Sequence, residues 1–224
     1  TGRALVHPGP ELSRTEVAAV VAELRRAAAT ATEHIAEVSQ LDRPAPADVL
    51  VVDRASWLAA VTQSAEAMLA GVGAETSGEK RSWPTQVSSK ALGVQAAGVF
   101  ALVANRILGQ FDPFVSPSRL LLVAPNIVTV ERQLAAAPSD FRLWVCLHEE
   151  THRFQFGHAA WLKGHLLGLL GELVDGDELR FGWPEGKDGV RGLVGSPEQK
   201  HAFEQVTALM SLMEGHADVM KIGR

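Results

Sequence analysis

The stretch Leu147-His148-Glu149-Glu150-Thr151-His152 contains the pattern H-E-x-x-H within a segment whose apolar spacing predicts a helix. Positions four apart lie on one face of a helix, so His148 and His152 can both offer an imidazole nitrogen to a single metal ion. Glu149 follows the first histidine, where its carboxylate can reach a water molecule on that ion. The pattern therefore predicts a catalytic zinc site with Glu149 as general base.

The residues before this motif favour a helix that runs from about Ser139 to Phe156. Ser139 is expected to be the N-cap residue, and Asp140 suits the positive end of a helix. Apolar side chains at 141, 144 and 145 fall on or near the stripe of the two histidines, so we expect this stripe to face inward. The alternative is an ordinary amphipathic helix whose two histidines bind nothing.

A catalytic zinc ion needs a third protein ligand, and two residues compete for this role. Glu214 and Asp218 share a face of a second predicted helix, so Glu214 could bind zinc while Asp218 accepts a hydrogen bond from a ligand histidine. His158 has the spacing of the third histidine in H-E-x-x-H-x-x-G-x-x-H, but position 155 is Gln where that pattern has Gly. We favour Glu214; the alternative for Glu214 and Asp218 is a solvated helix face.

The chain contains no Tyr, a residue whose hydroxyl stabilises the reaction's oxyanion in several zinc peptidases. Another donor must take this role if the chain performs that chemistry. His216, two residues after Glu214, is the first candidate for this catalytic role, and Arg153 is the second.

Length and composition are those of an ordinary globular protein. The 224 residues can build a sizeable core, and we expect one domain over 1–224, either undivided or with a helical part (1–84) packed on a metal-site part (85–224). The net charge of -5 gives no indication of nucleic-acid binding.

A cytoplasmic location is expected from three features. The only cysteine, Cys146, fits a reducing compartment and is expected to be a buried thiol. The N-terminal residues lack the apolar core of a secretory signal. The most apolar stretch, 91–108, contains Gln95, Asn105 and Arg106, and falls short of the roughly 20 apolar residues of a membrane-spanning helix.

The remaining pattern predicts a mainly helical α+β fold. A capping box at Ser13 and Glu16 opens a helix over 11–40, and a similar signature at Ser196 opens the last helix. Asn126 is expected to cap a helix that carries Glu131 on its surface. The other predicted elements are helices over 54–70, 85–108 and 158–170, strands over 48–52 and 119–123, and a loop over 175–196 that is either a mobile lid or disordered.

Four stretches, LVAPNIV (122–128), DFRLWV (140–145), HEETHR (148–153) and LMSLMEGHADV (209–219), resemble a bacterial zincin-like family of zinc-dependent metalloproteases or hydrolases. Some members of this family are associated with deazaflavin-coenzyme biosynthesis. The resemblance covers most of the chain and is densest from about 105 to 220. It implies a zincin-like helical domain in which His148, His152 and Glu214 bind zinc, Glu149 is the base, and a small sheet flanks the H-E-x-x-H helix. By analogy, the strand 120–124 would pair with an extended substrate.

Together these features predict a gluzincin-like zinc metallohydrolase, H-E-x-x-H plus a downstream Glu, that acts as a peptidase on a peptide or as an amidase on a small amide. Two alternatives come from other classes of protein. One is a non-catalytic, zinc-binding, zincin-like interaction module, and the other is a helical interaction protein in which the motif is accidental.

Overall fold

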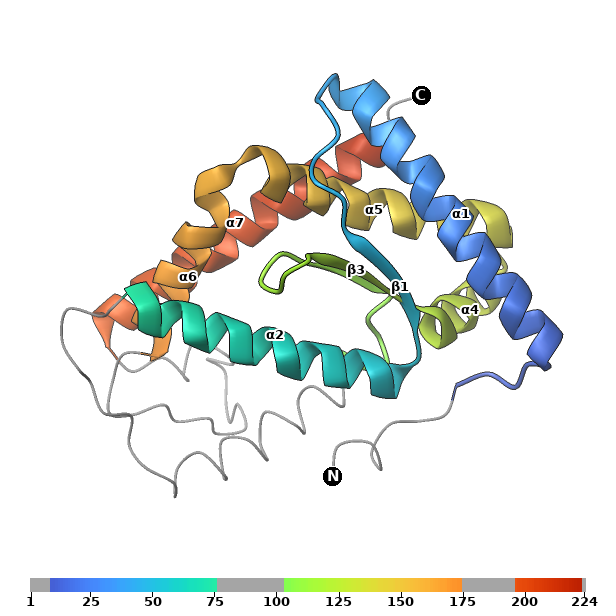
Figure 1. Cartoon of the computed structure of the whole chain (residues 1–224), viewed down its shortest axis with the longest axis horizontal. Helices are drawn as coiled ribbons and strands as arrows, with labels where there is room; N and C mark the ends of the chain where they lie inside the picture. The colour runs from blue at the N-terminus through green and yellow to red at the C-terminus, as the bar shows by residue number, and fades with distance from the viewer. Residues whose placement is uncertain (1–8, 76–102, 175–195, 223–224) are drawn as a thin grey trace.

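The computed structural model describes residues 9–75, 103–174 and 196–222. In these residues six helices surround a three-stranded sheet (Figure 1), which confirms the expected mainly helical α+β class. The elements in chain order are α1 (Arg14–Ser39), β1 (Asp48–Val52), α2 (Arg54–Glu75), β2 (Gly109–Asp112), β3 (Arg119–Val123), α4 (Ala124–Gln133), α5 (Pro138–His158), α6 (Ala160–Val174) and α7 (Pro197–Ile222). Most of the helix expected over 85–108 and the loop expected over 175–196 lie outside the described residues. The division at residue 84 stays a prediction.

The sheet is mixed, with strand order β1-β3-β2. β3 pairs in parallel with β1 and antiparallel with β2, so both of its edges are already hydrogen-bonded. The expectation that residues 120–124 would pair with a substrate is therefore wrong, because this strand has no free edge. The edge next to α5 belongs to β2, a strand that the sequence did not predict.

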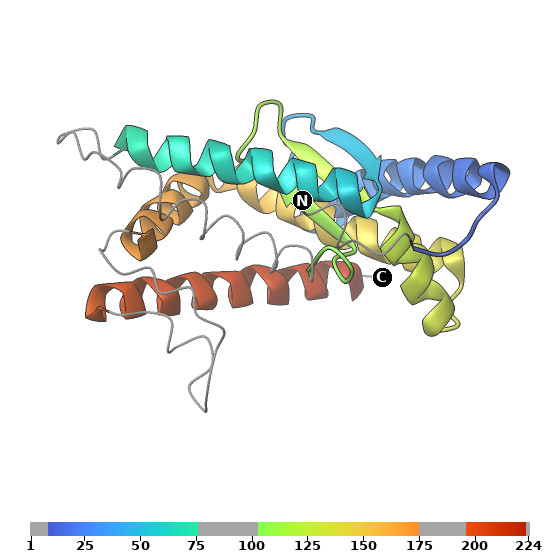
Figure 2. The ribbon, with the colours of Figure 1, turned by 90° about the horizontal axis from the view of Figure 1, so that it is seen from below.

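Helix α5 is the central element of the fold. It packs against α1 on one side and α7 on the other, and it also contacts β2. Figure 2 shows α2 and α7 along opposite sides of the molecule, with α6 between them and in contact with both. The main core lies between α1, α4, α5 and β3, and its fully buried members are Leu24, Ala31, Ile35, Leu120, Leu122, Ile127 and Cys146.

Two of the predicted helix starts are confirmed and two are wrong. The Ser13 hydroxyl accepts from the Glu16 amide at 3.2 Å while the Glu16 carboxylate accepts from the Ser13 amide at 2.7 Å. Ser196 and Gln199 make the same reciprocal pair at the start of α7. Helix α5, however, begins at Pro138 with Ala137 as N-cap, so Ser139 is already inside the helix.

Asn126 does not cap α4, which begins two residues earlier. Its side-chain amide is buried and donates to the carbonyl oxygens of Ala104 and Ile107, at 2.9 and 2.6 Å, while its oxygen accepts from Arg54. Asn126 therefore connects α4 to the chain that enters β2, a role that depends on a tertiary contact rather than on local sequence.

Two charged residues near the motif are buried in ion pairs. Glu131, expected on the surface, pairs with Arg142 at 2.7 Å and ties α4 to α5. Arg153 pairs with Glu150 at 2.7 Å and also donates to the carbonyl oxygens of Pro44 and Ala45. These contacts hold the Arg153 guanidinium on the α1 side of α5, away from the two histidines, so its candidacy as an oxyanion donor is not supported.

In the described part of the chain, no helix combines the length and the apolar character needed to cross a membrane.

Candidate metal centre

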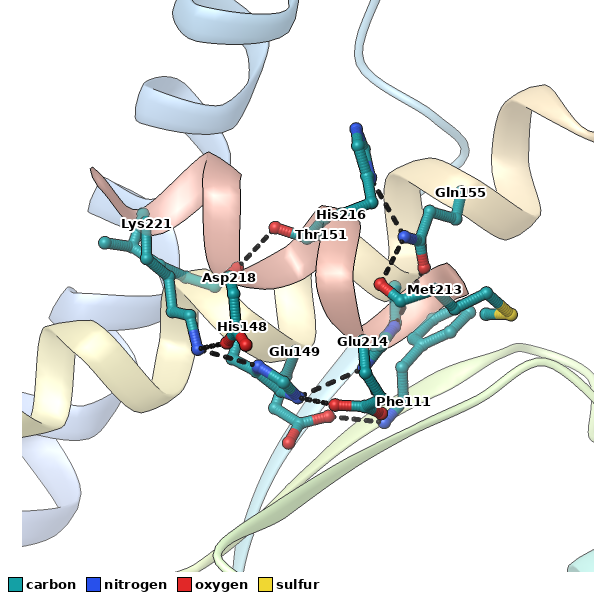
Figure 3. Close-up of polar contacts among 12 residues, drawn as sticks. Phe111, His148, Glu149, Thr151, Gln155, Met213, Glu214, His216, Asp218 and Lys221 are labelled. Carbon is teal, nitrogen blue, oxygen red and sulfur yellow. Dashed lines mark hydrogen bonds and ion pairs between the residues drawn. The ribbon is translucent and has the colours of Figure 1, made fainter. Parts of the chain in front are cut away.

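His148, His152 and Glu214 come together where α5 packs against α7. The two histidines lie one turn apart on α5. Helix α7 presents the Glu214 carboxylate to His148 (Figure 3) and also to His152. Their potential ligand atoms all lie within 4.8 Å of one another. Among the described residues this is the one group of three or more His, Cys, Asp or Glu side chains so arranged.

The distances between these atoms fit a tetrahedral ion. His148 Nε2 lies 3.2 Å from His152 Nε2, and the Glu214 carboxylate oxygens lie 3.1 Å from His148 Nε2 and 3.4 Å from His152 Nε2. Bonds of about 2.0–2.1 Å at tetrahedral angles separate neighbouring ligand atoms by roughly 3.3–3.4 Å. Two imidazole nitrogens and one carboxylate are also a donor set that zinc accepts. The side chains of His148, His152 and Glu214 therefore fit the ligand set of a zinc ion.

His158, the competing third ligand, is not part of this group. It is exposed near the end of α5, and its Nδ1 lies 3.0 Å from the carbonyl oxygen of Phe154. The three-histidine pattern needs a turn at position 155, but Gln155 lets the helix continue to His158. The sixth residue after His152 is thus carried past the site along the helix axis.

Glu149 is buried beside the three residues, at the edge of the sheet. Its Oε2 accepts a hydrogen bond of 3.1 Å from the backbone amide of Phe111 in β2. Burial raises the pKa of Glu149 to about 8; the Glu214 carboxylate acts in the same direction, while the Phe111 amide and Lys221 oppose it. The Phe111 amide therefore holds the carboxyl group in one place. Its raised pKa lies near neutral pH, the range in which a general base is most effective.

The surroundings of His148 differ from the prediction. Asp218 was expected to accept a hydrogen bond from a ligand histidine, but its side chain is exposed and pairs with Lys221 at 2.6 Å. It is the Lys221 ammonium that lies 3.1 Å from His148 Nδ1, and 3.9 Å above the Trp144 ring. Asp218 thus reaches His148 only through Lys221, because α7 turns its carboxylate toward solvent.

The pKa of His148 is lowered, first by burial and then by the charges of His152 and Lys221, while Glu214 and Asp218 oppose this shift. A lowered pKa favours the neutral imidazole, the form that binds a metal ion. Because an ammonium only donates, the Lys221 contact with Nδ1 leaves the ring proton on Nε2, so this contact must be given up when Nε2 binds an ion. Trp144 was expected to face inward, yet it is 44% exposed and stacks at the outer edge of His148.

His216 does not reach the site. It points away from Glu214 on the other side of α7 (Figure 3), and its Nδ1 lies 2.9 Å from Nε2 of Gln155. Residues two apart on a helix face nearly opposite directions, so a helix that presents Glu214 to the histidines turns His216 away. Its expected role as an oxyanion donor is not supported by this placement.

The sequence reasoning missed four residues around the site: Gly109, Phe111, Gln155 and Lys221. Gln155 and Lys221 follow the predicted ligands His152 and Glu214 by three and seven residues, so helical spacing alone could have found them. The two β2 residues left no such signal, because β2 is short and is defined by its pairing with β3.

Gly109 leaves the space that the Glu149 side chain occupies. A Cβ atom at this position would lie 2.7 Å from Cγ and 2.9 Å from Cδ of Glu149. We expect Gly109→Ala to lower the free energy of unfolding by about 1–3 kcal/mol, because the buried carboxyl group must shift. Urea denaturation followed by circular dichroism measures this change.

Gly168→Ala is the matched control. A Cβ atom there meets nothing within 4 Å on an exposed part of α6, so this change should stabilise the protein by up to about 1 kcal/mol. The cost of Gly109→Ala should also fall in a Glu149→Ala background, where the crowding is relieved. An equal cost in both backgrounds would show that Gly109 and Glu149 do not interact.

Two histidines of an H-E-x-x-H helix and a glutamate from a second helix form the donor set of a zincin-like metal site. The sequence matches the model of the zincin-like metallopeptidase family over residues 1–222, and the chain belongs to that family. No curated protein matches the sequence.

Among solved structures, the chain is similar to a candidate hydrolase with a novel fold from Chloroflexus aurantiacus. The two share 28% sequence identity with a TM-score of 0.66, over 97% of this chain and 64% of that one. The chain thus spans less than two thirds of the length of this relative. The association with deazaflavin-coenzyme biosynthesis stays a prediction.

Proposed function

We propose that the protein is a zinc-dependent hydrolase that cleaves amide bonds, with peptides as its main class of substrate. The observation that supports this proposal best is the spacing of His148, His152 and Glu214, with the buried Glu149 carboxyl beside them. The three ligands leave a fourth tetrahedral position for water or substrate, as catalytic zinc sites require. Membership of the zincin-like metallopeptidase family supports the same assignment.

In this proposal His148 and His152 bind zinc through Nε2, and Glu214 binds it through its carboxylate. When bound, such an ion supplies Lewis acidity, which makes a water molecule nucleophilic near neutral pH and polarises a carbonyl group. Glu149 accepts the proton of the attacking water and then delivers it to the nitrogen of the leaving amine. The Phe111 amide holds the Glu149 carboxylate in the orientation for both transfers.

We also place this activity in the cytoplasm. The described chain forms no disulfide, which fits a reducing compartment.

The cysteine, Cys146, is buried in the core, and burial is the main cause that raises the pKa of its thiol to about 12. A thiol in this state is protonated and unreactive, so it neither serves as a nucleophile nor competes for the metal ion.

The test combines metal analysis with activity. The purified protein should contain one zinc per chain by mass spectrometry of its metal content. Removal of zinc with a chelator should abolish cleavage of a mixed peptide library, and stoichiometric zinc should restore it. A stoichiometric zinc ion without hydrolysis of peptides or small amides would instead favour the non-catalytic module. The absence of zinc binding would remove the proposal altogether.

A further inference from the structure

Gln155 connects the two helices that build the metal centre. It lies one turn after His152 on α5, and its side-chain amide reaches across to α7 (Figure 3). Its Oε1 lies 2.8 Å from His152 Nδ1, and its Nε2 lies 2.9 Å from the Met213 carbonyl oxygen and 2.9 Å from His216 Nδ1. One amide group therefore contacts a predicted metal ligand and the backbone next to another, Glu214.

The chemistry of these partners fixes the orientation of the amide. A backbone carbonyl only accepts hydrogen bonds, so the group that faces Met213 must be the amide NH₂. The amide oxygen consequently faces His152, whose Nδ1 must carry a proton in order to donate to it. A neutral imidazole with its proton on Nδ1 has its lone pair on Nε2, the atom that faces Glu214 and His148.

We propose that Gln155 is a positioning residue of the metal centre. It selects the tautomer of His152 that binds a metal ion through Nε2, and it holds the backbone beside Glu214 at the distance that closes the site. This inference rests on the proposed function for the identity of the metal. Partners of this kind orient the ligand ring and raise its basicity, and their loss commonly weakens metal binding by about 10–100-fold.

The two contacts can be separated by substitution. Gln155→Leu removes both of them. Gln155→Glu keeps an acceptor for His152 Nδ1 but sets a carboxylate oxygen against the Met213 carbonyl oxygen, so it retains the tautomer and loses the link to α7. His216→Ala removes only the contact between Gln155 and His216 and should leave the tautomer of His152 unchanged. Gln205→Leu is the matched control, because it breaks a similar Gln–His contact, with His201, elsewhere on α7.

Two measurements test the proposal. Long-range ¹H–¹⁵N spectra of the histidine rings in metal-free protein, recorded well above the ordinary histidine pKa of about 6.5, report the tautomer directly. Competition with a coloured chelator reports zinc affinity. We expect His152 to be protonated at Nδ1 in the native protein and to populate both tautomers in Gln155→Leu. Zinc affinity should fall by about 10–100-fold in that variant and recover in part in Gln155→Glu.

The proposal is overturned if Gln155→Leu keeps both the native tautomer of His152 and the native zinc affinity. It is also overturned if Gln155→Glu has the same mixture of tautomers and the same zinc affinity as Gln155→Leu. If the native protein itself binds no zinc, the proposed function fails. The tautomer spectra of the metal-free variants then decide alone whether Gln155 sets the state of His152.

Discussion

Glu149→Gln is expected to keep one zinc ion per chain and to lower kcat by about 10²–10⁴, the contribution of a positioned general base. The amide oxygen of glutamine can still accept the hydrogen bond from the Phe111 amide, so the side chain should stay in place. It cannot, however, take a proton from water. Because Glu149 is not among the three converging ligand residues, its loss should leave metal affinity close to native.

The neighbouring residue provides the control. Glu150→Gln changes another buried carboxylate on the same helix, but this one faces Arg153 and the core rather than the histidines. It should lower the free energy of unfolding, because a buried arginine loses its charged partner, and leave kcat near native. Metal analysis and turnover of the best library peptide compare the two variants. Loss of zinc with retained turnover in Glu149→Gln would contradict the assigned roles.

Glu214→Ala is expected to have the largest effect on metal binding and to lower zinc affinity by more than about 100-fold. This loss exceeds the roughly 10–100-fold expected when a residue that only hydrogen-bonds to a ligand is removed. Glu214 supplies the only carboxylate of the described group, and it comes from a different helix than the two histidines. Without it, α5 retains two imidazoles, a number too small for a catalytic zinc site.

Thermal unfolding with and without zinc provides a second measurement of the same change. A ligand at 100 times its Kd stabilises the folded state by about 2.7 kcal/mol, so native protein should melt at a higher temperature with zinc. Glu214→Ala should lose this response, whereas Glu204→Ala, an exposed glutamate on the same helix, should keep it. A native zinc response in Glu214→Ala would show that another residue completes the site.

The sequence predicted the local features of the fold well. Strands at 48–52 and 119–123, the capping boxes of α1 and α7, and the pairing of His148 with His152 all follow from side-chain periodicity or from groups three or four residues apart. Interactions over such short separations are set by helix and strand geometry, whatever the rest of the chain does.

The errors concern groups whose partners are distant in the chain. Asn126 looks like a helix cap in the sequence, but its partners are carbonyl groups about twenty residues earlier. Glu131 looks like a surface charge until Arg142 from the next helix buries it. Asp218 has the spacing of a support for a histidine, yet the packing angle of α7 gives this position to Lys221. The partners of Asn126 and Glu131 cannot be found from local spacing, and the spacing that puts Asp218 and Lys221 on one face does not tell which of the two contacts His148.

The amino-acid sequence by itself determined which side chains share a face: two imidazoles on one helix, and Glu214 with Asp218 and Lys221 on another. Only the tertiary structure decided that these two faces meet, that β2 anchors Glu149, and that Gln155 joins the helices beside His152. The reason is physical. Helical periodicity acts over a few residues, whereas the meeting of α5 and α7 depends on how the side chains between them and their neighbours pack into a common core.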